Sequence, residues 1–351
     1  MPYRMVNGKI IVDVQVGGKV RPFLLDTGCS RTYISNKVNA GLNSQPTTTV
    51  LFAQDSGGQV FSAPVVRLDS LRCGNWVVTG RKVGVLDDNY PLLKCFGIDG
   101  IIGSDLLKKS VLHISSRDSV LILTSHVNRL PVRLGAPVMV SLREKRPYIQ
   151  ITGRNGNREA SHWVLLDIGA NGYSCSSGDF RSLEQEGVME QQERGYGRSS
   201  YSVSGPEKPR EQSRGILPEL WIGQVRLEQV PVRTTGGPVS LLGTFLLEYG
   251  DITIDYRKKR FYYTVFTEDT RMKTERFPVS VLFDEGRMVI GVVWDETLKP
   301  IIREGDTVLS VNGNPTEQFN ICGYFTGDFT LEPGMVFRVK TETGEMVEIT
   351  L

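Results

Sequence analysis

The sequence contains few of the residues that bind metals or build disulfide frameworks. Among 351 residues there are 5 cysteines and 3 histidines. The cysteines are scattered without a Cys-x-x-Cys pair, and no His-Glu-x-x-His spacing occurs, so neither a zinc site nor a dense disulfide framework is indicated. We therefore expect no metal ion and no cofactor. Two alternatives remain for the cysteines: one disulfide bridge forms, for example between Cys73 and Cys95, or all five are mostly buried apolar residues.

The sequence also lacks a long apolar run and a strong net charge. No run approaches the roughly 20 apolar residues that span a bilayer, so we expect no membrane insertion. The net charge of +2 gives no reason to expect nucleic acid as a partner. No basic and apolar leader stands before the first strand-like stretch. If a leader was removed, we expect a periplasmic or other extracytoplasmic location.

What the sequence does contain is an internal repeat. Short strand-like stretches with period-2 alternation fill residues 1–126, and a second set follows in the same order within 131–268. The stretch "PFLLDTGCS" ends one strand and "WVLLDIGAN" ends its counterpart, and their aspartates, Asp26 and Asp167, are 141 residues apart. The glycines of "IIG" (101–103) and "LLG" (241–243) are 140 residues apart. A shared order at one offset predicts two related, mainly β lobes, here called the first repeat and the second repeat.

Each repeat places an acid at the end of an apolar strand. Gly28 and Gly169 follow these acids two residues later and permit tight turns. If the lobes pack about a pseudo-twofold axis, Asp26 and Asp167 meet at the junction. Two charges about 4 Å apart repel by roughly 4 kcal/mol at an effective dielectric of 20, so the pair would share a proton. Such a pair can activate water for peptide hydrolysis. A glycosidase pair of carboxylates is disfavoured by the tandem Asp-x-Gly turns in a β-rich repeat.

These motifs resemble those of the pepsin/retropepsin aspartic peptidases. Each Asp-x-Gly turn is followed in its repeat by hydrophobic-hydrophobic-Gly, and the arrangement with a further C-terminal unit is similar to bacterial retropepsin-like proteases that carry a PDZ domain. The resemblance implies a catalytic dyad of Asp26 and Asp167. It also implies two barrel lobes related as in pepsin, and a flap hairpin that closes over bound peptide.

The second motif departs from that family. The residue after each catalytic aspartate is usually Thr or Ser, whose hydroxyl bonds across to the other lobe; Thr27 fits, but Ile168 has no hydroxyl. Losing one buried hydrogen bond costs about 1 kcal/mol, or about 1–3 kcal/mol if its partner is left unpaired. Cys29 and Ala170 stand where a supporting Ser is common. We therefore expect the fold to survive, whereas dyad geometry could loosen.

Two hairpins are candidates for a lid over the cleft. Residues 47–63 are β-prone around Gly57 and Gly58, which we expect at the flap tip with Phe52 and Phe61 flanking the cleft. The second repeat has a polar insert at 181–214, with Tyr196 and Tyr201, which is either a second lid or an ordinary variable loop.

Residues 272–351 form a separate unit that resembles a PDZ domain through "IIREGDTVLSVNGNP" and "GRMVIGVV". We call residues 272–351 the C-terminal unit. PDZ domains bind peptides by strand addition beside a helix, but "NICGYFTGDFTLEPG" supports that helix poorly because it holds three glycines and a proline. The C-terminal unit is therefore either a structural cap or a peptide-binding domain.

The sequence thus predicts a mainly β monomer of three domains, at 1–126, 131–268 and 272–351. The leading hypothesis is an aspartic endopeptidase acting on peptide or protein substrates. Alternatives are a peptide-binding pseudoprotease that lost turnover through Ile168, and a structural protein that uses the repeat as a scaffold.

Overall fold

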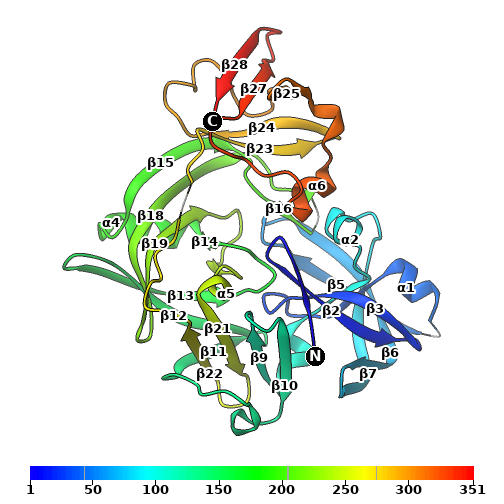
Figure 1. Cartoon of the computed structure of the whole chain (residues 1–351). Coiled ribbons are helices and arrows are strands. Elements are labelled where there is room, and N and C mark those ends of the chain that lie inside the picture. The colour runs from blue at the N-terminus through cyan, green and yellow to red at the C-terminus, as the bar shows by residue number, and fades with distance from the viewer. Residues whose placement is uncertain (43, 204, 274) are drawn as a thin grey trace.

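The first repeat forms a twisted eight-stranded sheet. The computed structural model describes residues 1–42, 44–203, 205–273 and 275–351. The strand order of the first sheet is β1-β2-β3-β8-β4-β7-β6-β5, at the lower right of Figure 1. Its elements are β1 (Arg4–Val6), β2 (Lys9–Val16), β3 (Lys19–Leu25), β4 (Tyr33–Ser35), α1 (Asn36–Ala40), β5 (Gln45–Gln54), β6 (Val60–Cys73), β7 (Trp76–Leu86), α2 (Pro91–Phe96), β8 (Gly100–Ile102) and α3 (Ser104–Leu107).

The β2–β3 hairpin shows why this sequence folds locally as it does. Gly17 and Gly18 connect the strands with φ of 58° and 74°, and two positive φ angles are what a tight type I′ hairpin requires. The inward residues of β2 alternate with exposed ones, as period-2 patterning predicts. The hairpin therefore delivers β3, and the aspartate that follows it, into the interior.

The second repeat is built from the same kinds of hairpins. Together with the C-terminal unit and strands β9 (Val111–Ser115) and β10 (Val120–Thr124), its strands join into a closed, barrel-like array. Its elements are η1 (Val127–Arg129), β11 (Val138–Arg143), β12 (Arg146–Asn155), β13 (Arg158–Leu166), β14 (Tyr173–Cys175), α4 (Ser177–Gln185), β15 (Glu190–Gly197), β18 (Arg210–Ile222), β19 (Val225–Thr234), β20 (Leu241–Leu242), α5 (Leu246–Tyr249), β21 (Gly250–Asp255) and β22 (Arg260–Val265). Strands β16 (Tyr201–Ser202) and β17 (Gly205–Pro206) form a separate small hairpin.

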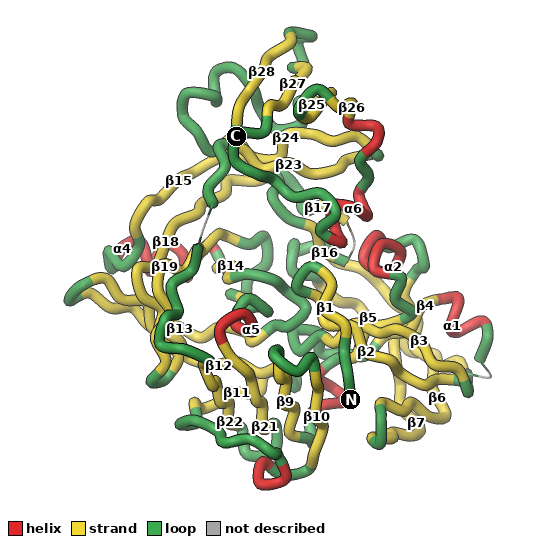
Figure 2. Tube along the Cα trace, in the orientation of Figure 1, coloured by secondary structure: helices red, strands yellow, loops and turns green. Residues whose placement is uncertain are grey.

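A shared sheet joins the two repeats below the acids. Strand β9 belongs to the first repeat by sequence but pairs antiparallel with β21, with Ile114 opposite Ile252. Figure 2 shows β9, β10, β21, β22 and β11 side by side at the bottom of the molecule. Ile114, Ile252 and Ile254 are fully or almost fully buried in one hydrophobic cluster that draws on both repeats. This continuous core fixes how the two repeats face each other.

The C-terminal unit has a hydrophobic core of its own, which includes Val279, Phe283 and Phe337. It lies at the top of Figure 1, above both repeats. Its elements are β23 (Val279–Asp284), β24 (Arg287–Val293), β25 (Thr307–Val311), β26 (Asn314–Pro315), η2 (Thr316–Gln318), α6 (Ile321–Thr326), β27 (Val336–Lys340) and β28 (Met346–Thr350). The weakly supported helix of the sequence is present as α6, and it is only six residues long.

A disulfide links the C-terminal unit to the first repeat. Cys95 on α2 is bonded to Cys322 on α6, across a sequence separation of 227 residues. The possible Cys73–Cys95 bridge is therefore wrong: Cys73 lies buried with a free thiol, 3.4 Å from the Met1 sulfur. Sequence spacing could not reveal the true pair, because it depends on how the C-terminal unit docks. None of the helices in the described ranges is long and apolar enough to span a membrane.

The disulfide predicts a specific cross-link. Digestion without reduction should yield the peptide containing Cys95 joined to that containing Cys322, while Cys29, Cys73 and Cys175 react with an alkylating agent after unfolding. Replacing Cys322 by Ser should lower the free energy of unfolding by up to about 5 kcal/mol, because the bridge closes a long loop. Mass spectrometry and urea titration measure the two effects. A cross-link to Cys73 instead would contradict this docking of α6.

Candidate active site

Both aspartates leave buried strands that have equivalent neighbours. Strand β3 runs parallel to β8, and Asp26 N donates to Ile102 O at 3.0 Å. Strand β13 runs parallel to β20, and Asp167 N donates to Leu242 O at 2.9 Å. The "IIG" and "LLG" motifs therefore supply the strands beside the two acids. This explains why each motif recurs at nearly the same offset as its aspartate.

The structure brings Asp26 and Asp167 together across the junction of the repeats. A Cβ atom built on Gly28 would lie 2.3 Å from Asp167 Cγ, and one on Gly169 would lie 2.5 Å from Asp26 Cγ. Each carboxyl thus packs directly on the other repeat's turn, in space that only glycine leaves open. Each carboxyl therefore lies close enough to affect the ionisation of the other.

Backbone amides support the carboxyls where the sequence offers no hydroxyl. Cys29 N donates to Asp26 Oδ1 at 2.9 Å, and Gly169 N donates to Asp167 Oδ1 at 2.9 Å. The Cys29 thiol turns away and donates to Arg31 O. A Ser at position 29 or 170 is therefore not needed for each acid to have a donor.

Burial and mutual repulsion perturb both acids. Desolvation, followed by the charge of Asp167, holds the pKa of Asp26 well above its usual range. Desolvation also raises the pKa of Asp167, but the Lys9 ammonium and hydrogen bonds oppose that shift. Because each group affects the ionisation of the other, the two acids titrate as a coupled pair, and the negative charge is favoured on Asp167.

The two Asp-x-Gly turns are joined by hydrogen bonds of the Thr27 hydroxyl, which we call the lock, and the second turn supplies no equivalent hydroxyl. Thr27 Oγ1 donates to Leu166 O at 2.6 Å and accepts from Ile168 N at 3.1 Å. Ile168 is 1% exposed and packs in the core that both repeats share. Its side chain fills the space but returns no hydrogen bond, so Thr27 provides the hydroxyl contact from one side alone.

Lys9 is a site residue that sequence reasoning missed. It opens β2, and its ammonium donates to Gly169 O at 2.5 Å and to Asn171 Oδ1 at 2.8 Å. Desolvation lowers its pKa to about 8, against the opposing pull of Asp167 and Asp26. Lys9 therefore holds the second turn from the first repeat. A lone lysine at the start of a strand carries no signal of such a contact.

Ser104 and Tyr256 add a second contact that the sequence did not reveal. Ser104 Oγ donates to Thr27 O at 2.7 Å and lies 3.2 Å from the Tyr256 hydroxyl. Tyr256 comes from the second repeat and is fully buried. The helix α3 has Gly103 at its N-cap and begins at Ser104. The Ser104 hydroxyl is therefore free to support the Thr27 turn.

The β5–β6 hairpin crosses from the first repeat to the second. Gly57 and Gly58 lie in its tip, and Thr235 Oγ1 of the second repeat donates to Ser56 O at 2.8 Å. Phe61 packs near Tyr33 and Tyr90, with both ring centroids at 6.2 Å. Phe52, by contrast, is 78% exposed. Contact of Phe52 and Phe61 with a substrate stays a prediction.

No metal cluster is found among the described residues. No group of three His, Cys, Asp or Glu side chains there has the geometry to hold an ion. The histidines bond to neighbouring side chains instead: His113 Nδ1 lies 2.8 Å from Thr253 Oγ1, and His162 Nε2 lies 2.6 Å from the Tyr173 hydroxyl.

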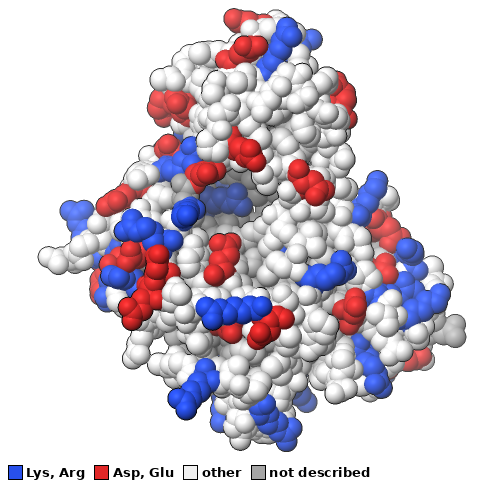
Figure 3. Space-filling model, viewed as in Figure 1, with Lys and Arg blue, Asp and Glu red and all other residues white. Residues whose placement is uncertain are grey.

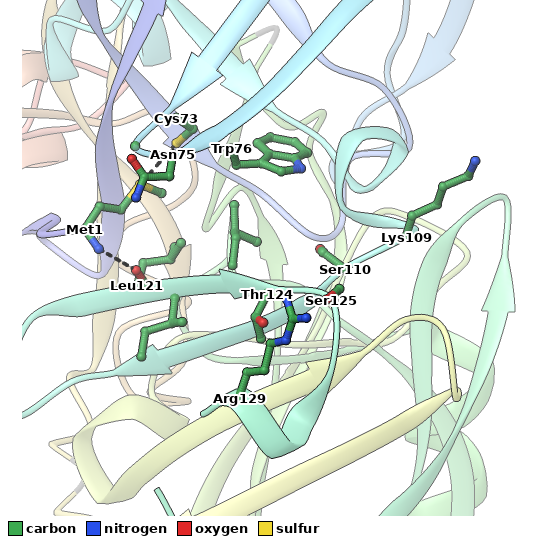
Figure 4. A pocket seen from close by; sticks show the side chains of 13 residues that line it. Met1, Cys73, Asn75, Trp76, Lys109, Ser110, Leu121, Thr124, Ser125 and Arg129 are labelled. Carbon is green, nitrogen blue, oxygen red and sulfur yellow. Dashed lines mark hydrogen bonds between the residues drawn. The ribbon is translucent and has the colours of Figure 1, made fainter. Parts of the chain in front are cut away.

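A cavity of about 540 Å³ lies away from the acids, between β7 and β10. Figure 4 shows Trp76, Leu121 and Met1 around it, with the Met1 amino group donating to Leu121 O at 2.8 Å. Lys109 extends away from the cavity, and neither aspartate lines it. The residues that line it include no Asp, Glu or His.

The one-sided lock predicts a measurable loss of stability. Replacing Thr27 by Val removes a donor to Leu166 O and leaves Ile168 N without its acceptor. We expect a loss of about 1–3 kcal/mol in the free energy of unfolding, measured by urea titration. Thr48→Val on the exposed face of β5 is the matched control. An equal effect of the two changes would contradict the lock.

Because the pKa of Asp26 is raised, replacing this residue by the uncharged Asn should increase the free energy of unfolding, by an amount that depends on pH. The unfolded aspartate ionises near its ordinary value of 3.8, but the folded one ionises well above it. Folding therefore binds a proton between these values, and wild-type stability falls as pH rises through the folded pKa. Asp26→Asn should be more stable than wild type at neutral pH, by about 1.4 kcal/mol per unit of pKa elevation. The difference should shrink as pH falls to 4. A constant difference in thermal unfolding across this range would refute it.

A comparison with known protein families finds a match within the first repeat. Residues 12–106 match the family model described as aspartyl protease. The matched stretch runs from β2 to α3 and contains Asp26, Thr27 and Gly28, together with the "IIG" strand. No curated protein matches the chain. The match supports a retropepsin-like aspartic protease domain over this stretch, and with it a peptidase function.

Proposed function

We propose that the protein is an aspartic endopeptidase in which Asp26 and Asp167 together activate a water molecule. One observation carries the proposal: each carboxyl lies directly against the turn glycine of the other repeat, so that the two buried acids meet at the junction. Two buried carboxyls held this way ionise in separated steps. The pair therefore has an acid and a base available at the same pH.

The environment of each acid suggests its role. Asp167 lies near the Lys9 ammonium and is the favoured site of negative charge, so it accepts a proton from the water. The water oxygen bonds to the peptide carbonyl carbon while protonated Asp26 donates its proton to the carbonyl oxygen. As the resulting tetrahedral gem-diol collapses, protonated Asp167 donates its proton to the leaving amine nitrogen, ionised Asp26 accepts a proton from a gem-diol hydroxyl, and the C–N bond breaks. This second step returns each carboxyl to its starting protonation state. These steps use no metal ion and no covalent intermediate.

The proposed architecture is two retropepsin-like lobes, at 1–126 and 131–268, with the substrate between them. The equivalent pairing of β3 with β8 and of β13 with β20 supports two related lobes. The β5–β6 hairpin, with Gly57 and Gly58 in its tip, would be the flap. An extended peptide or protein segment is the substrate, and the enzyme acts as a monomer.

Residues 272–351 form the proposed PDZ-like domain. Its separate core and its hairpin strands beside a short helix support a compact unit. A peptide is its proposed ligand. The Cys95–Cys322 bridge favours an oxidising, extracytoplasmic compartment, because structural disulfides persist there.

A peptide-binding protein without turnover is the second candidate. Ile168 gives it support, because the second turn lacks a hydroxyl that could return the contact made by Thr27. A displacement near 1 Å at a reacting group can cost about 100-fold in rate. Lys9 and Ser104 provide other contacts to these turns and favour the enzyme.

Neutralising either acid tests the enzyme directly. Asp26→Asn and Asp167→Asn should each reduce cleavage of a denatured-protein substrate by at least about 1,000-fold, because the pair loses its acid or its base. Asp13→Asn changes an exposed aspartate on β2 and should leave cleavage unchanged. Turnover is measured by mass spectrometry of the digest. Undiminished turnover in Asp26→Asn would remove the catalytic assignment.

Restoring the hydroxyl distinguishes the two candidates. A peptide-library digest between pH 3 and 8 is run with wild type and with Ile168→Thr. We expect cleavage by both, with a gain of no more than about ten-fold in the Thr variant, because Lys9 already holds the second turn. Ile168→Val is the control that stays β-branched without a hydroxyl. Cleavage by the Thr variant alone would favour the peptide-binding protein.

A further inference from the structure

One extended stretch of the second repeat lies on the C-terminal unit. We call residues 197–203, which run from the last residue of β15 through β16, the latch segment. Gly197 pairs with Val292, and Arg198 N donates to Gly291 O at 3.0 Å. Gly197 has a φ of 137°, and a Cβ atom there would lie 1.9 Å from Gly291 O. The close approach of the two backbones therefore requires glycine at this position.

Charge fixes the latch segment in place. The Arg198 guanidinium pairs with Asp284 at 2.8 Å and with Glu304 at 2.6 Å, and its side chain is only 12% exposed. Both carboxylates belong to the C-terminal unit. A largely buried arginine shared by two acids positions a segment more strictly than an exposed ion pair does.

Tyr201 occupies a strand edge of the C-terminal unit. Its hydroxyl donates to Phe283 O at 2.7 Å and accepts from Phe283 N. Its ring lies 5.7 Å from that of Tyr324 and 4.9 Å from that of Phe325 on α6. Within the described residues, β23 pairs with β24 alone. A single side chain thus satisfies the edge N–H and C=O that an extended peptide backbone could bond.

The other end of the latch segment holds the tip of the β5–β6 hairpin. Ser202 follows Tyr201, and its hydroxyl donates to Asp55 Oδ2 at 2.6 Å. The other carboxylate oxygen of Asp55 accepts from the amides of Gly57 and Gln59, and so organises the tip. Gln59 Nε2 donates to Pro206 O at 2.8 Å. The tip is therefore attached beside the residue that occupies the β23 edge.

The first repeat holds α6 independently of the latch segment. Cys322 is bonded to Cys95, and Asn7 Nδ2 donates to Phe325 O at 2.9 Å. Figure 1 shows α6 between α2 and the rest of the C-terminal unit. Figure 3 shows a hollow between the C-terminal unit and the repeats below it, with basic side chains in its wall. If the latch segment leaves, the aromatic wall made by α6 stays in position.

We propose that in the free protein the latch segment occupies the β23 edge beside α6, where the proposed PDZ-like domain would take its peptide, and that an extended peptide with an aromatic side chain that replaces the latch segment frees the β5–β6 tip. In relating the tip to substrate entry, this inference rests on the proposed endopeptidase. Binding at the edge does not depend on turnover. The latch segment itself shows the chemistry required: an aromatic ring with a basic residue three positions before it.

The first experiment measures binding of a labelled peptide that reproduces the latch segment, Gly-Arg-Ser-Ser-Tyr-Ser-Val. The double variant Arg198→Ala, Tyr201→Ala empties the edge in the full chain and should bind this peptide at least ten-fold more tightly than wild type. In wild type the tethered segment competes at high effective concentration. Tyr196→Ala, at an exposed tyrosine of the same insert, should behave as wild type. A peptide with Ala in place of its Tyr should bind neither protein.

Equal binding by wild type and the double variant, or binding by neither, would overturn the proposed site. Circular dichroism and thermal unfolding show whether the double variant is folded. If it is not, the wild-type measurement with Tyr201→Phe decides: this milder change keeps the ring and should raise peptide affinity several-fold. Unchanged affinity in Tyr201→Phe would then count against the site.

The second experiment follows the tip by hydrogen exchange. Amides of residues 55–59 should exchange about ten-fold faster in Ser202→Ala, and also in wild type saturated with the labelled peptide. Tyr196→Phe is the control and should leave exchange unchanged. Tip exchange that responds to neither change would refute the coupling. Both experiments can be run in Asp26→Asn, so failure of the proposed enzyme and failure of the latch remain distinguishable.

Discussion

The arrangement depends on bringing two carboxyl groups together in the interior and keeping them there. Asp26 and Asp167 repel when both are ionised, and burial penalises either charge. Only a rigid frame can hold such a pair. The frame is the shared β9–β21 sheet and the common core below, together with turns whose glycines admit the opposite carboxyl. The repulsion between the acids is thus opposed by the buried core that both repeats share.

Above that frame, the contacts between the two turns are unequal. The Thr27 hydroxyl forms hydrogen bonds with the backbone of Leu166 and Ile168, but the Ile168 side chain has no hydroxyl that could bond to the first turn. Lys9 instead holds the Gly169 carbonyl and so ties the second turn to the first repeat. The same lysine places positive charge near Asp167, which makes the two acids inequivalent. One cation therefore contributes both to positioning and to the division of roles within the pair.

Local sequence predicted the parts of the site that depend on strand and turn chemistry. The apolar strands ending at Asp26 and Asp167 and the glycine turns follow from patterning along one stretch. Lys9, the Cys95–Cys322 bridge and the docking of Tyr201 all join segments far apart in the chain. Their partners are set by how whole units pack, and a single sequence carries no periodic signal for that. The repeat offset was informative because it related two such distant segments.

The most direct test of the central claim is a carbon-13 NMR titration of aspartate carboxyls in the whole protein, assigned with single Asn variants. A buried, coupled pair predicts two separated steps, of which one lies well above the ordinary aspartate range and moves when either acid is replaced. Independent titration of Asp26 and Asp167 near the ordinary value, each indifferent to loss of the other, would contradict the shared proton and the mechanism built on it.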